Sequence, residues 1–247
     1  MRYAQVKGIC FDLGYTLIDY KTHNWQQIDL EGNKRGYDDL KESGFDLPDF
    51  EEFHVRLEDL KKNTRPTDKW KMEEWKATDA PNKLFAELGI DKPSEISKRF
   101  IESTYSVSRH YMKLIDGVIE TLTLFKQHGY KLGLISNTLF SPELMNGDLE
   151  MLGLDGLFDA KIYSSEVGFR KPHPRIFFYA AGKMGLAPDE MIYVGDRYRV
   201  DMLGARYSGM HPILFYREDL EYPGYMPRSI PIIDGMPGLN EVLGINR

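Results

Sequence analysis

Apolar runs that end abruptly in polar side chains recur along this chain, with amphipathic stretches between them. The first run ends at Phe11, before Asp12; a later one, KLGLIS, ends before Asn137; and a third, MIYVG, ends before Asp196. Such runs, bounded by turn residues, predict buried strands. The strands are expected at residues 6–11, 131–136, 160–163, 191–195 and 212–215.

The amphipathic stretches predict the helices that connect these strands. Val118, Leu122 and Phe125 lie at helical spacing. Further helices are expected near 143–152, after Pro174, up to about Gly209 and near 239–243, with a short apolar run at 230–233. Strands that alternate with helices through short loops predict an α/β fold with a doubly wound parallel sheet.

One long stretch interrupts this alternation. Between residues 19 and 115 the pattern changes to helix after helix, for example with Phe53, Leu57 and Leu60 on one face. Pro48 suits the first turn of that helix. We therefore expect two domains: an α/β core formed by residues 1–18 and 116–247, and an inserted all-helical domain formed by residues 19–115.

Polar residues gather at the predicted strand and loop ends. In an open parallel sheet, these ends converge on one crevice, where active sites lie. Each such residue alone would be an ordinary turn former or helix cap. Their repetition at successive strand ends predicts one active site. The set comprises Asp12, Ser136, Asn137, Lys171, Asp196 and Asp201.

The charges in this set predict a metal ion. Three aspartates bring three negative charges and Lys171 returns one, so one divalent cation would balance the rest. Carboxylates at close range repel strongly, and an oxygen-only ligand set suits Mg²⁺ rather than zinc. Ser136, Lys171 and backbone N–H groups could then hold a phosphate. This arrangement serves phosphoryl transfer, with Asp12 as the nucleophile that forms an aspartyl-phosphate.

Composition narrows the classes of partner. The 247 residues carry a net charge of −6, which offers no basic surface for nucleic acid. No run approaches the apolar length that a membrane span needs. The single cysteine, Cys10, is compatible with a reducing compartment, and we expect it to be a small buried apolar side chain. We expect a cytoplasmic protein that acts on a small phosphorylated metabolite, without nucleic acid or membrane partners; the oligomeric state stays open.

Four segments, taken together, resemble the motifs of the haloacid dehalogenase superfamily of hydrolases. FDLGYTLID is similar to the first family motif, LISNT to the second, the Lys-Pro of GFRKPHPRIF to the third and VGDRYRVD to the fourth. The resemblance implies a doubly wound core, a mobile helical cap inserted between the first two motifs, and a Mg²⁺-dependent phosphatase. The implied metal ligands are Asp12, Asp196 and the backbone carbonyl of Gly14; the implied phosphate-binding residues are Ser136, Asn137 and Lys171; and Asp201 would support the metal or Lys171.

The chain departs from the family at Gly14. Most phosphatase members have a second Asp there, which protonates the leaving oxygen, and such assistance is typically worth about 10²–10⁴ in rate. Three explanations stay open: an easily departing leaving group, a proton from another residue, or a slow protein with a binding role. The nearest donors in sequence are Asp19, Tyr15, Tyr20 and His23, although Asp19 also suits a turn or a cap. Glycine here could also hold a backbone conformation that Asp tolerates less well.

Two rival chemistries are compatible with glycine at this position. Metal-independent 2-haloacid dehalogenases use the same nucleophile and also lack the second Asp, but Asp196 after Gly195 favours a metal-dependent phosphatase. Phosphonate cleavage would need a lysine of the inserted domain. The candidates are Lys34, Lys41, Lys61, Lys62, Lys69 and Lys71, each of which also suits an exposed helix face. Arg170, Arg197 and Arg199 flank the predicted site, where an arginine could bind a second anionic group of a substrate.

Overall fold

The computed structural model describes residues 3–21, 24–66, 72–224 and 226–245. A six-stranded sheet forms the centre of the fold, with the order β5-β4-β1-β6-β7-β8 and parallel pairing throughout. Ile9 pairs with Leu132 on one side and with Ile192 on the other, so the first strand is internal. The strands are β1 (Gly8–Phe11), β4 (Lys131–Ser136), β5 (Ala160–Tyr163), β6 (Met191–Gly195), β7 (His211–Phe215) and β8 (Ile232–Ile233).

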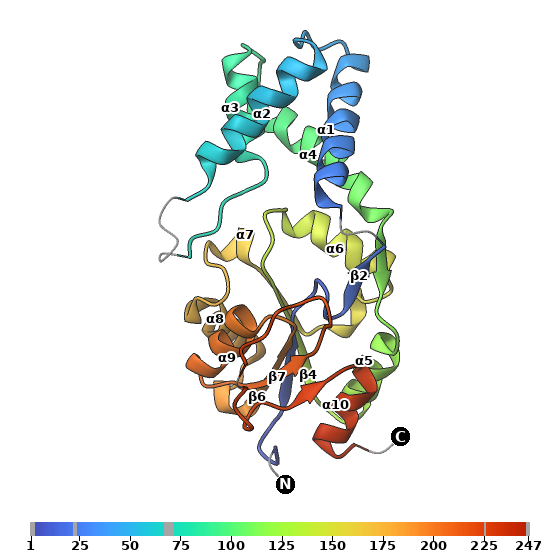
Figure 1. Cartoon of the computed structure of the whole chain (residues 1–247), viewed down its shortest axis with the longest axis vertical. Coiled ribbons are helices and arrows are strands. Elements are labelled where there is room, and N and C mark those ends of the chain that lie inside the picture. Colours follow the sequence, from blue (N-terminus) through green and yellow to red (C-terminus); the bar gives the residue numbers. More distant parts are fainter. Residues whose placement is uncertain (1–2, 22–23, 67–71, 225, 246–247) are drawn as a thin grey trace.

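Helices cover both faces of this sheet, because successive side chains of a strand point to opposite faces. Phe11 packs in one buried cluster with Leu122 and Leu239, whereas Cys10 packs in a second cluster with Phe177. The core helices are α5 (Val118–Gln127), α6 (Pro142–Met151), α7 (Ser164–Val167), α8 (Pro174–Met184), α9 (Leu203–Tyr207) and α10 (Met236–Leu243), with short helical segments at Asp155–Leu157, Pro188–Glu190 and Tyr198–Met202. Figure 1 shows α8 and α9 on one side of the strands and α5 and α10 on the other. The predicted doubly wound α/β fold is confirmed.

Four further helices lie between β1 and β4 in the chain and form the upper part of the molecule in Figure 1. They are α1 (Trp25–Glu42), α2 (Phe50–Thr64), α3 (Asp79–Glu87) and α4 (Pro93–Arg109). Phe53, Phe85 and Phe100 form the centre of their own buried cluster. Pro48 precedes α2 rather than lying in its first turn, and Asp49 caps that helix by accepting from the Glu52 amide. No helix in the described parts of the chain is both long and apolar enough for a membrane crossing.

The prediction that residues 19–115 are all helical is wrong at the two ends of this segment, which form strands. β2 (Ile18–Tyr20) pairs antiparallel with β3 (Met112–Leu114), and Tyr20 lies opposite Met112. Three-residue strands are too short to leave a periodic pattern in the sequence. The two passages of the chain between sheet and helices therefore form one hydrogen-bonded ribbon. The division into residues 1–18 with 116–247 and residues 19–115 stays a prediction.

Helix α1 has no counterpart among the predicted elements. Its buried face begins and ends with Ile28, Tyr37 and Leu40, but Gly32, Asn33 and Gly36 occupy the middle of it. A Cβ atom at Gly32 would lie 2.8 Å from the carbonyl oxygen of Thr104, and one at Gly36 would lie 2.7 Å from the ring of Phe100. The helix therefore packs against α4 at close range through glycine. Hydrophobic periodicity does not reveal a helix of this kind.

Candidate active site

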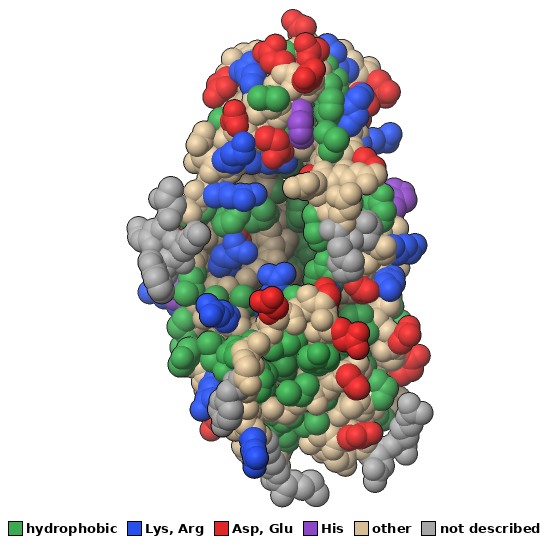
Figure 2. Space-filling model, in the orientation of Figure 1, with side chains coloured by type: hydrophobic (Ala, Val, Ile, Leu, Met, Phe, Trp, Pro, Cys, Tyr) green, Lys and Arg blue, Asp and Glu red, His purple; other side chains and the backbone are tan. Residues whose placement is uncertain are grey.

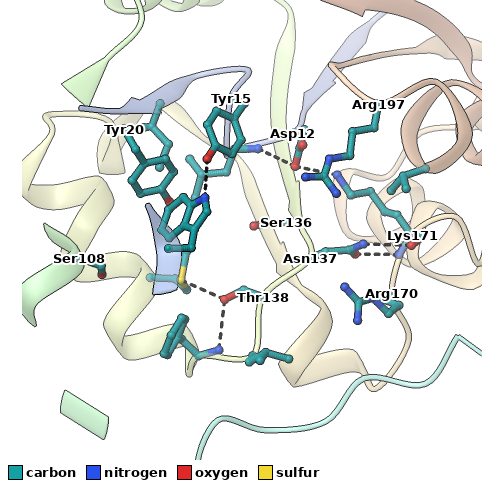
Figure 3. Close-up of a pocket in the computed structure, with 18 of the residues that line it drawn as sticks. Asp12, Tyr15, Tyr20, Ser108, Ser136, Asn137, Thr138, Arg170, Lys171 and Arg197 are labelled. Atoms are coloured by element: carbon teal, nitrogen blue, oxygen red, sulfur yellow. Dashed lines mark hydrogen bonds and ion pairs between the residues drawn. The ribbon is translucent and has the colours of Figure 1, made fainter. Parts of the chain in front are cut away.

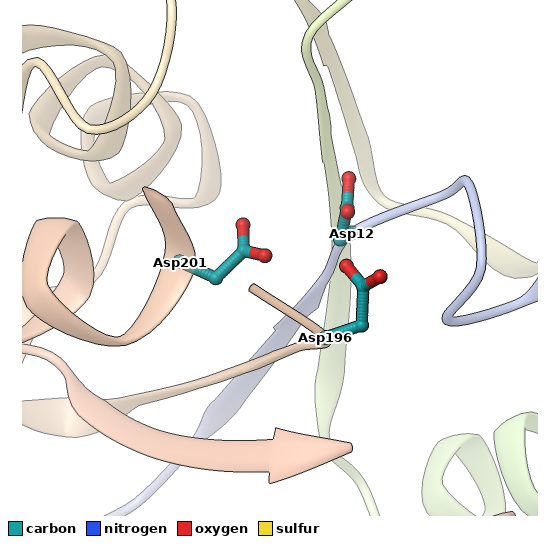
Figure 4. A group of neighbouring side chains, drawn as sticks. All are labelled: Asp12, Asp196 and Asp201. Atoms are coloured by element: carbon teal, nitrogen blue, oxygen red, sulfur yellow. The ribbon is translucent and has the colours of Figure 1, made fainter. Parts of the chain in front are cut away.

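The three aspartates predicted to bind a metal lie together at the carboxyl ends of the strands (Figure 4). Asp12 directly follows β1 and Asp196 directly follows β6, while Asp201 lies in the helical segment 198–202. Their ligand atoms all lie within 4.8 Å of one another, and Asp196 and Asp201 are buried. Neighbouring parallel strands bring these residues together across nearly two hundred positions of sequence.

Lys171 lies at the centre of this carboxylate cluster. Its Nζ donates to Asp12 Oδ1 at 2.7 Å, to Asp201 Oδ1 at 2.8 Å and to the Tyr193 hydroxyl at 2.6 Å. Burial opposes the ammonium charge, but the two carboxylates prevail and raise the pKa of Lys171 above its ordinary value. The side chain is thus a fixed cation beside Asp12, as the predicted phosphate-binding role requires.

Asp196 is compensated less completely than the other two aspartates. Its Oδ2 lies 3.5 Å from Nη1 of Arg217, and its buried Oδ1 has no hydrogen-bond partner among the described residues. Burial, followed by the charges of Asp12 and Asp201, raises the pKa of Asp196 to about 7. Burial also raises the pKa of Asp12 to about 6, against the opposing charge of Lys171. An unpartnered buried carboxylate oxygen is costly, and a bound cation would satisfy it.

The other predicted site residues surround this cluster. Ser136 ends β4 and lines the same cavity as Asp12 (Figure 3). Gly14 lines this cavity from the turn that follows Asp12. The side chain of Asn137 accepts from the Lys171 amide at 2.7 Å and donates to the Lys171 carbonyl at 3.0 Å. Asn137 therefore holds the loop that carries Lys171. The assigned roles in metal and substrate binding stay predictions.

A cavity of about 450 Å³ lies between the sheet and the inserted helices, where the space-filling view is hollowed (Figure 2). Of the proposed proton donors, Tyr15 and Tyr20 line it. Asp19 does not line it and instead pairs with Lys113 at 3.1 Å. His23 lies outside the described residues.

The described lysines considered for phosphonate cleavage do not line this cavity. Three of them pair with acidic neighbours on their own helix, and the fourth donates to a backbone carbonyl. These are Lys34, Lys61 and Lys62, and then Lys41. Lys69 and Lys71 lie outside the described residues, so no described lysine of the inserted segment is in place for the phosphonate reaction.

Three residues of the site escaped the sequence analysis. Tyr193 lies on β6 and touches Lys171, and Arg217 follows the end of β7, the strand next to β6. The sequence could have indicated both residues, because each lies on or just after a strand that leads into the site. Glu74 lines the cavity from the loop between α2 and α3, and nothing in its sequence surroundings indicates that position.

Comparison with known proteins gives the family. Residues 53–215 match the family model described as haloacid dehalogenase-like hydrolase. A protein of Methanocaldococcus jannaschii named glyceraldehyde 3-phosphate phosphatase is 30% identical over 91% of this chain and 94% of its own length. A protein of Methanopyrus kandleri with the same name is 31% identical, over 59% of this chain and 61% of its own length.

Solved structures show the same fold over nearly the whole chain. A phosphatase from Thermococcus onnurineus matches with a TM-score of 0.63 at 24% identity, over 98% of this chain and 100% of that one. A 2-haloacid dehalogenase from Pseudomonas syringae matches with a TM-score of 0.67 at 21% identity, over 97% and 98% of the two chains. The chain therefore belongs to the haloacid dehalogenase-like hydrolases, and its predicted family, fold and hydrolase class are confirmed.

Proposed function

We propose that the protein is a Mg²⁺-dependent phosphohydrolase that acts on a small phosphorylated metabolite through an aspartyl-phosphate at Asp12. The observation that carries this proposal is the convergence of Asp12, Asp196 and Asp201, two of which, Asp12 and Asp201, pair with Lys171. The cluster combines a candidate nucleophile with a fixed cation at the sheet edge. It contains the acidic pair of a metal site, which a metal-independent dehalogenase does not need.

The donor set supports magnesium. Its side-chain ligands are carboxylate oxygens, which Mg²⁺ prefers, and the partnerless Oδ1 of Asp196 is where a cation would lower the cost of burial most. Asp12, Asp196 and the carbonyl of Gly14 would hold the ion, with Asp201 behind them. When bound, the ion would neutralise carboxylate charge and stabilise the charge that develops on the phosphoryl oxygens.

The residues of the chain supply the other requirements of phosphoryl transfer. Asp12 accepts hydrogen bonds from Lys171 and from the Leu13 amide, which orient its carboxylate. Its oxygen would attack phosphorus, the bond from phosphorus to the ester oxygen would break, and that oxygen would take up a proton from water or a cavity group, which leaves an aspartyl-phosphate. Water would then attack that phosphorus, release inorganic phosphate and restore the Asp12 carboxylate. Ser136 and Lys171 would donate to the phosphoryl oxygens throughout.

The size of the cavity suits a small ester. At about 450 Å³, the cavity is at the small end of ligand-binding pockets in proteins. The relatives named above are called glyceraldehyde 3-phosphate phosphatases. Glyceraldehyde 3-phosphate is therefore the first ester to test as a substrate of this chain.

The decisive experiment measures phosphate release with the native protein and with Asp12→Asn. We expect the variant to fold and to lose more than about a hundredfold in kcat/KM, which is about 2.7 kcal/mol of transition-state stabilisation. Asp19→Asn is the matched control, because it removes a carboxylate from the same segment but outside the cavity. An Asp12→Asn protein that keeps more than about a hundredth of the native activity excludes the nucleophilic role.

The same assay tests the metal. A chelator should abolish phosphate release and Mg²⁺ should restore it. Calcium should support it poorly, because its longer bonds and larger coordination number loosen the octahedral arrangement. Full activity in chelator, together with chloride release from a 2-haloacid, would establish the dehalogenase instead.

A further inference from the structure

A loop of the inserted domain reaches the core beside Lys171. In the segment 72–77, the Glu74 amide donates to the Gly168 carbonyl at 3.0 Å, and the Arg170 amide donates to the Met72 carbonyl at 2.9 Å. These two bonds align the loop with the segment that leads into Lys171. They place the side chains of Glu74 and Arg170 together in the wall of the cavity.

The carboxylate of Glu74 is enclosed there by polar partners. The side chain has no exposed surface, and its Oε1 lies 3.5 Å from Nη1 of Arg170. Its Oε2 accepts from the hydroxyl of Ser164 at 2.6 Å. The Arg170 guanidinium also lies 5.1 Å from the ring centroid of Trp75, the residue after Glu74. Arg170 is thus held in place, and its charge is balanced by a residue from the other domain.

The balance of charge along the cavity follows from these contacts. At the end where phosphate would bind, Lys171 and Arg197 face Asp12, and no contact among the described residues pairs the Arg197 guanidinium with a carboxylate. In the close-up, Arg170 lies below Lys171, whereas Asp12 lies above it (Figure 3). The wall there continues with apolar and aromatic side chains such as Phe140. Beyond the phosphate position, the described lining therefore offers no uncompensated cation.

We propose that Glu74 is a specificity-determining residue that selects phosphomonoesters whose carbon chain carries no second anionic group. This inference rests on the proposed phosphatase function. A substrate carboxylate beside Arg170 would also meet the carboxylate of Glu74, and the repulsion would cancel the attraction. A neutral hydroxyl or aldehyde oxygen could still accept a hydrogen bond from Arg170 without this penalty. Glu74 and Arg170 together would thus favour substrates that are uncharged at the end away from the phosphate.

The test compares esters of one carbon skeleton. Glyceraldehyde 3-phosphate and glycerol 3-phosphate have neutral ends, whereas 3-phosphoglycerate ends in a carboxylate. We expect the native protein to favour the neutral esters at least about tenfold in kcat/KM, which corresponds to about 1.4 kcal/mol. Glu74→Gln keeps the shape and the Ser164 contact but frees the charge of Arg170, so it should raise relative activity on 3-phosphoglycerate about tenfold.

Two further variants isolate the cause. Glu73→Gln removes the same charge from the neighbouring exposed position and should leave the ratio between the esters unchanged. Glu74→Gln combined with Arg170→Gln should lose the gain, because the freed guanidinium is what binds the carboxylate. If Glu74→Gln alone does not fold, Arg170→Gln alone decides: it leaves Glu74 in place and should lower activity on 3-phosphoglycerate further than on the neutral esters.

Three results would overturn the inference. They are a native preference for 3-phosphoglycerate, an unchanged ratio in folded Glu74→Gln, and a gain that survives loss of Arg170. The absence of phosphate release from all three esters in the native protein with Mg²⁺ has a different meaning. It counts against the phosphatase function itself, so the two failures are distinguishable.

Discussion

Tyr15 has a backbone φ of 62°, in the left-handed region that favours glycine. The φ of its neighbour Gly14 lies outside that region. This conformation costs a residue with a large side chain about 1–2 kcal/mol. The guanidinium of Arg217 lies 3.9 Å from the centroid of the Tyr15 ring, and the Tyr15 hydroxyl accepts from Trp25 at 3.1 Å. A cation–π contact is worth about 0.5–2 kcal/mol, which is of the same size as the cost. Arg217 also contacts Asp196, so one side chain holds both the turn after Asp12 and a predicted metal ligand.

The geometry of Gly14 bears directly on the missing general acid. A Cβ atom at Gly14 would meet no atom within 4 Å, and its φ lies outside the left-handed region. The turn therefore has room for a side chain, and Gly14 does not hold the glycine-specific backbone that the sequence left open. Gly14→Asp can therefore be made without left-handed backbone strain at this position.

Gly14→Asp should raise activity selectively on poor leaving groups. Without a proton donor, the native rate should fall steeply as the leaving oxygen becomes more basic. The new carboxyl should raise kcat/KM for alkyl phosphates by about 10–10² while changing activated aryl phosphates little. A series of esters measured in both proteins checks this, with Gly14→Asn as the uncharged control. If the native protein shows no dependence on the leaving group, another residue of the cavity already donates the proton.

Individual residues differ in how far the sequence could reveal them. Asp12, Lys171, Asp196 and Asp201 were predictable because each lies at a strand or loop end, and parallel topology brings such ends together. Their distances and hydrogen bonds depend on side-chain packing that no local pattern contains. Glu74 was not predictable, because it reaches the cavity through a contact between two loops far apart in sequence.

At the scale of elements, α4 and α6 are joined by a buried polar contact next to the ribbon of β2 and β3. Asp148 of α6 is 1% exposed, and it accepts hydrogen bonds from the Tyr105 hydroxyl and, at 2.6 Å, from Nε of Arg109. Burial raises the pKa of Asp148, and the two donors from α4 oppose that shift. The carboxylate therefore depends on α4 for its side-chain partners.

Arg109→Met should destabilise the protein by leaving Asp148 with one partner. Because Arg109 is 31% exposed and Tyr105 remains, we expect a loss of about 2 kcal/mol in the free energy of unfolding rather than the full cost of breaking a buried pair. Chemical denaturation measures this. Arg56→Met is the control, since its pairs with Glu52 and Glu87 are exposed and should contribute under about 0.5 kcal/mol. Equal effects of the two substitutions would contradict a structural role for Asp148.

Helices and strands also differ in how well the sequence predicts them. The sheet strands and α2 were predictable, because apolar runs and a helical stripe mark them directly. Helix α1 was not, since Gly32 and Gly36 interrupt its apolar stripe, and neither were β2 and β3, whose stability comes from pairing across more than ninety residues. In each case the missing information is tertiary.

At the scale of the whole molecule, the carboxylate cluster links stability to pH and to metal. The folded-state pKa values of Asp12 and Asp196 are raised to about 6 and about 7. Groups raised in this way stabilise the fold fully below their unfolded pKa, near 4, and that contribution is lost as the pH rises through the folded values. Without a divalent cation, the free energy of unfolding should therefore fall between about pH 4 and pH 7.

Magnesium should reverse this loss, because it binds the ionised carboxylates of the folded state. We expect Mg²⁺ to raise the melting temperature more at about pH 8 than at about pH 5, where protons compete for the same oxygens. Thermal unfolding with and without the ion at both pH values measures the difference. Asp196→Asn should remove most of the Mg²⁺ effect, and an equal Mg²⁺ effect at both pH values would exclude these carboxylates as its source.

The ribbon of β2 and β3 also bears on how such a chain could arise. Since Tyr20 lies directly opposite Met112, a two-residue turn could join them as a hairpin. From the side of the sheet, everything between these residues is a single loop whose ends are already held at strand spacing. The entropy of closing a flexible loop grows only with the logarithm of its length, by about 0.6 kcal/mol per doubling. Loop closure therefore places little limit on the length of an insertion at this point, and a replacement must instead supply partners for the core groups that α4 now satisfies, such as Asp148.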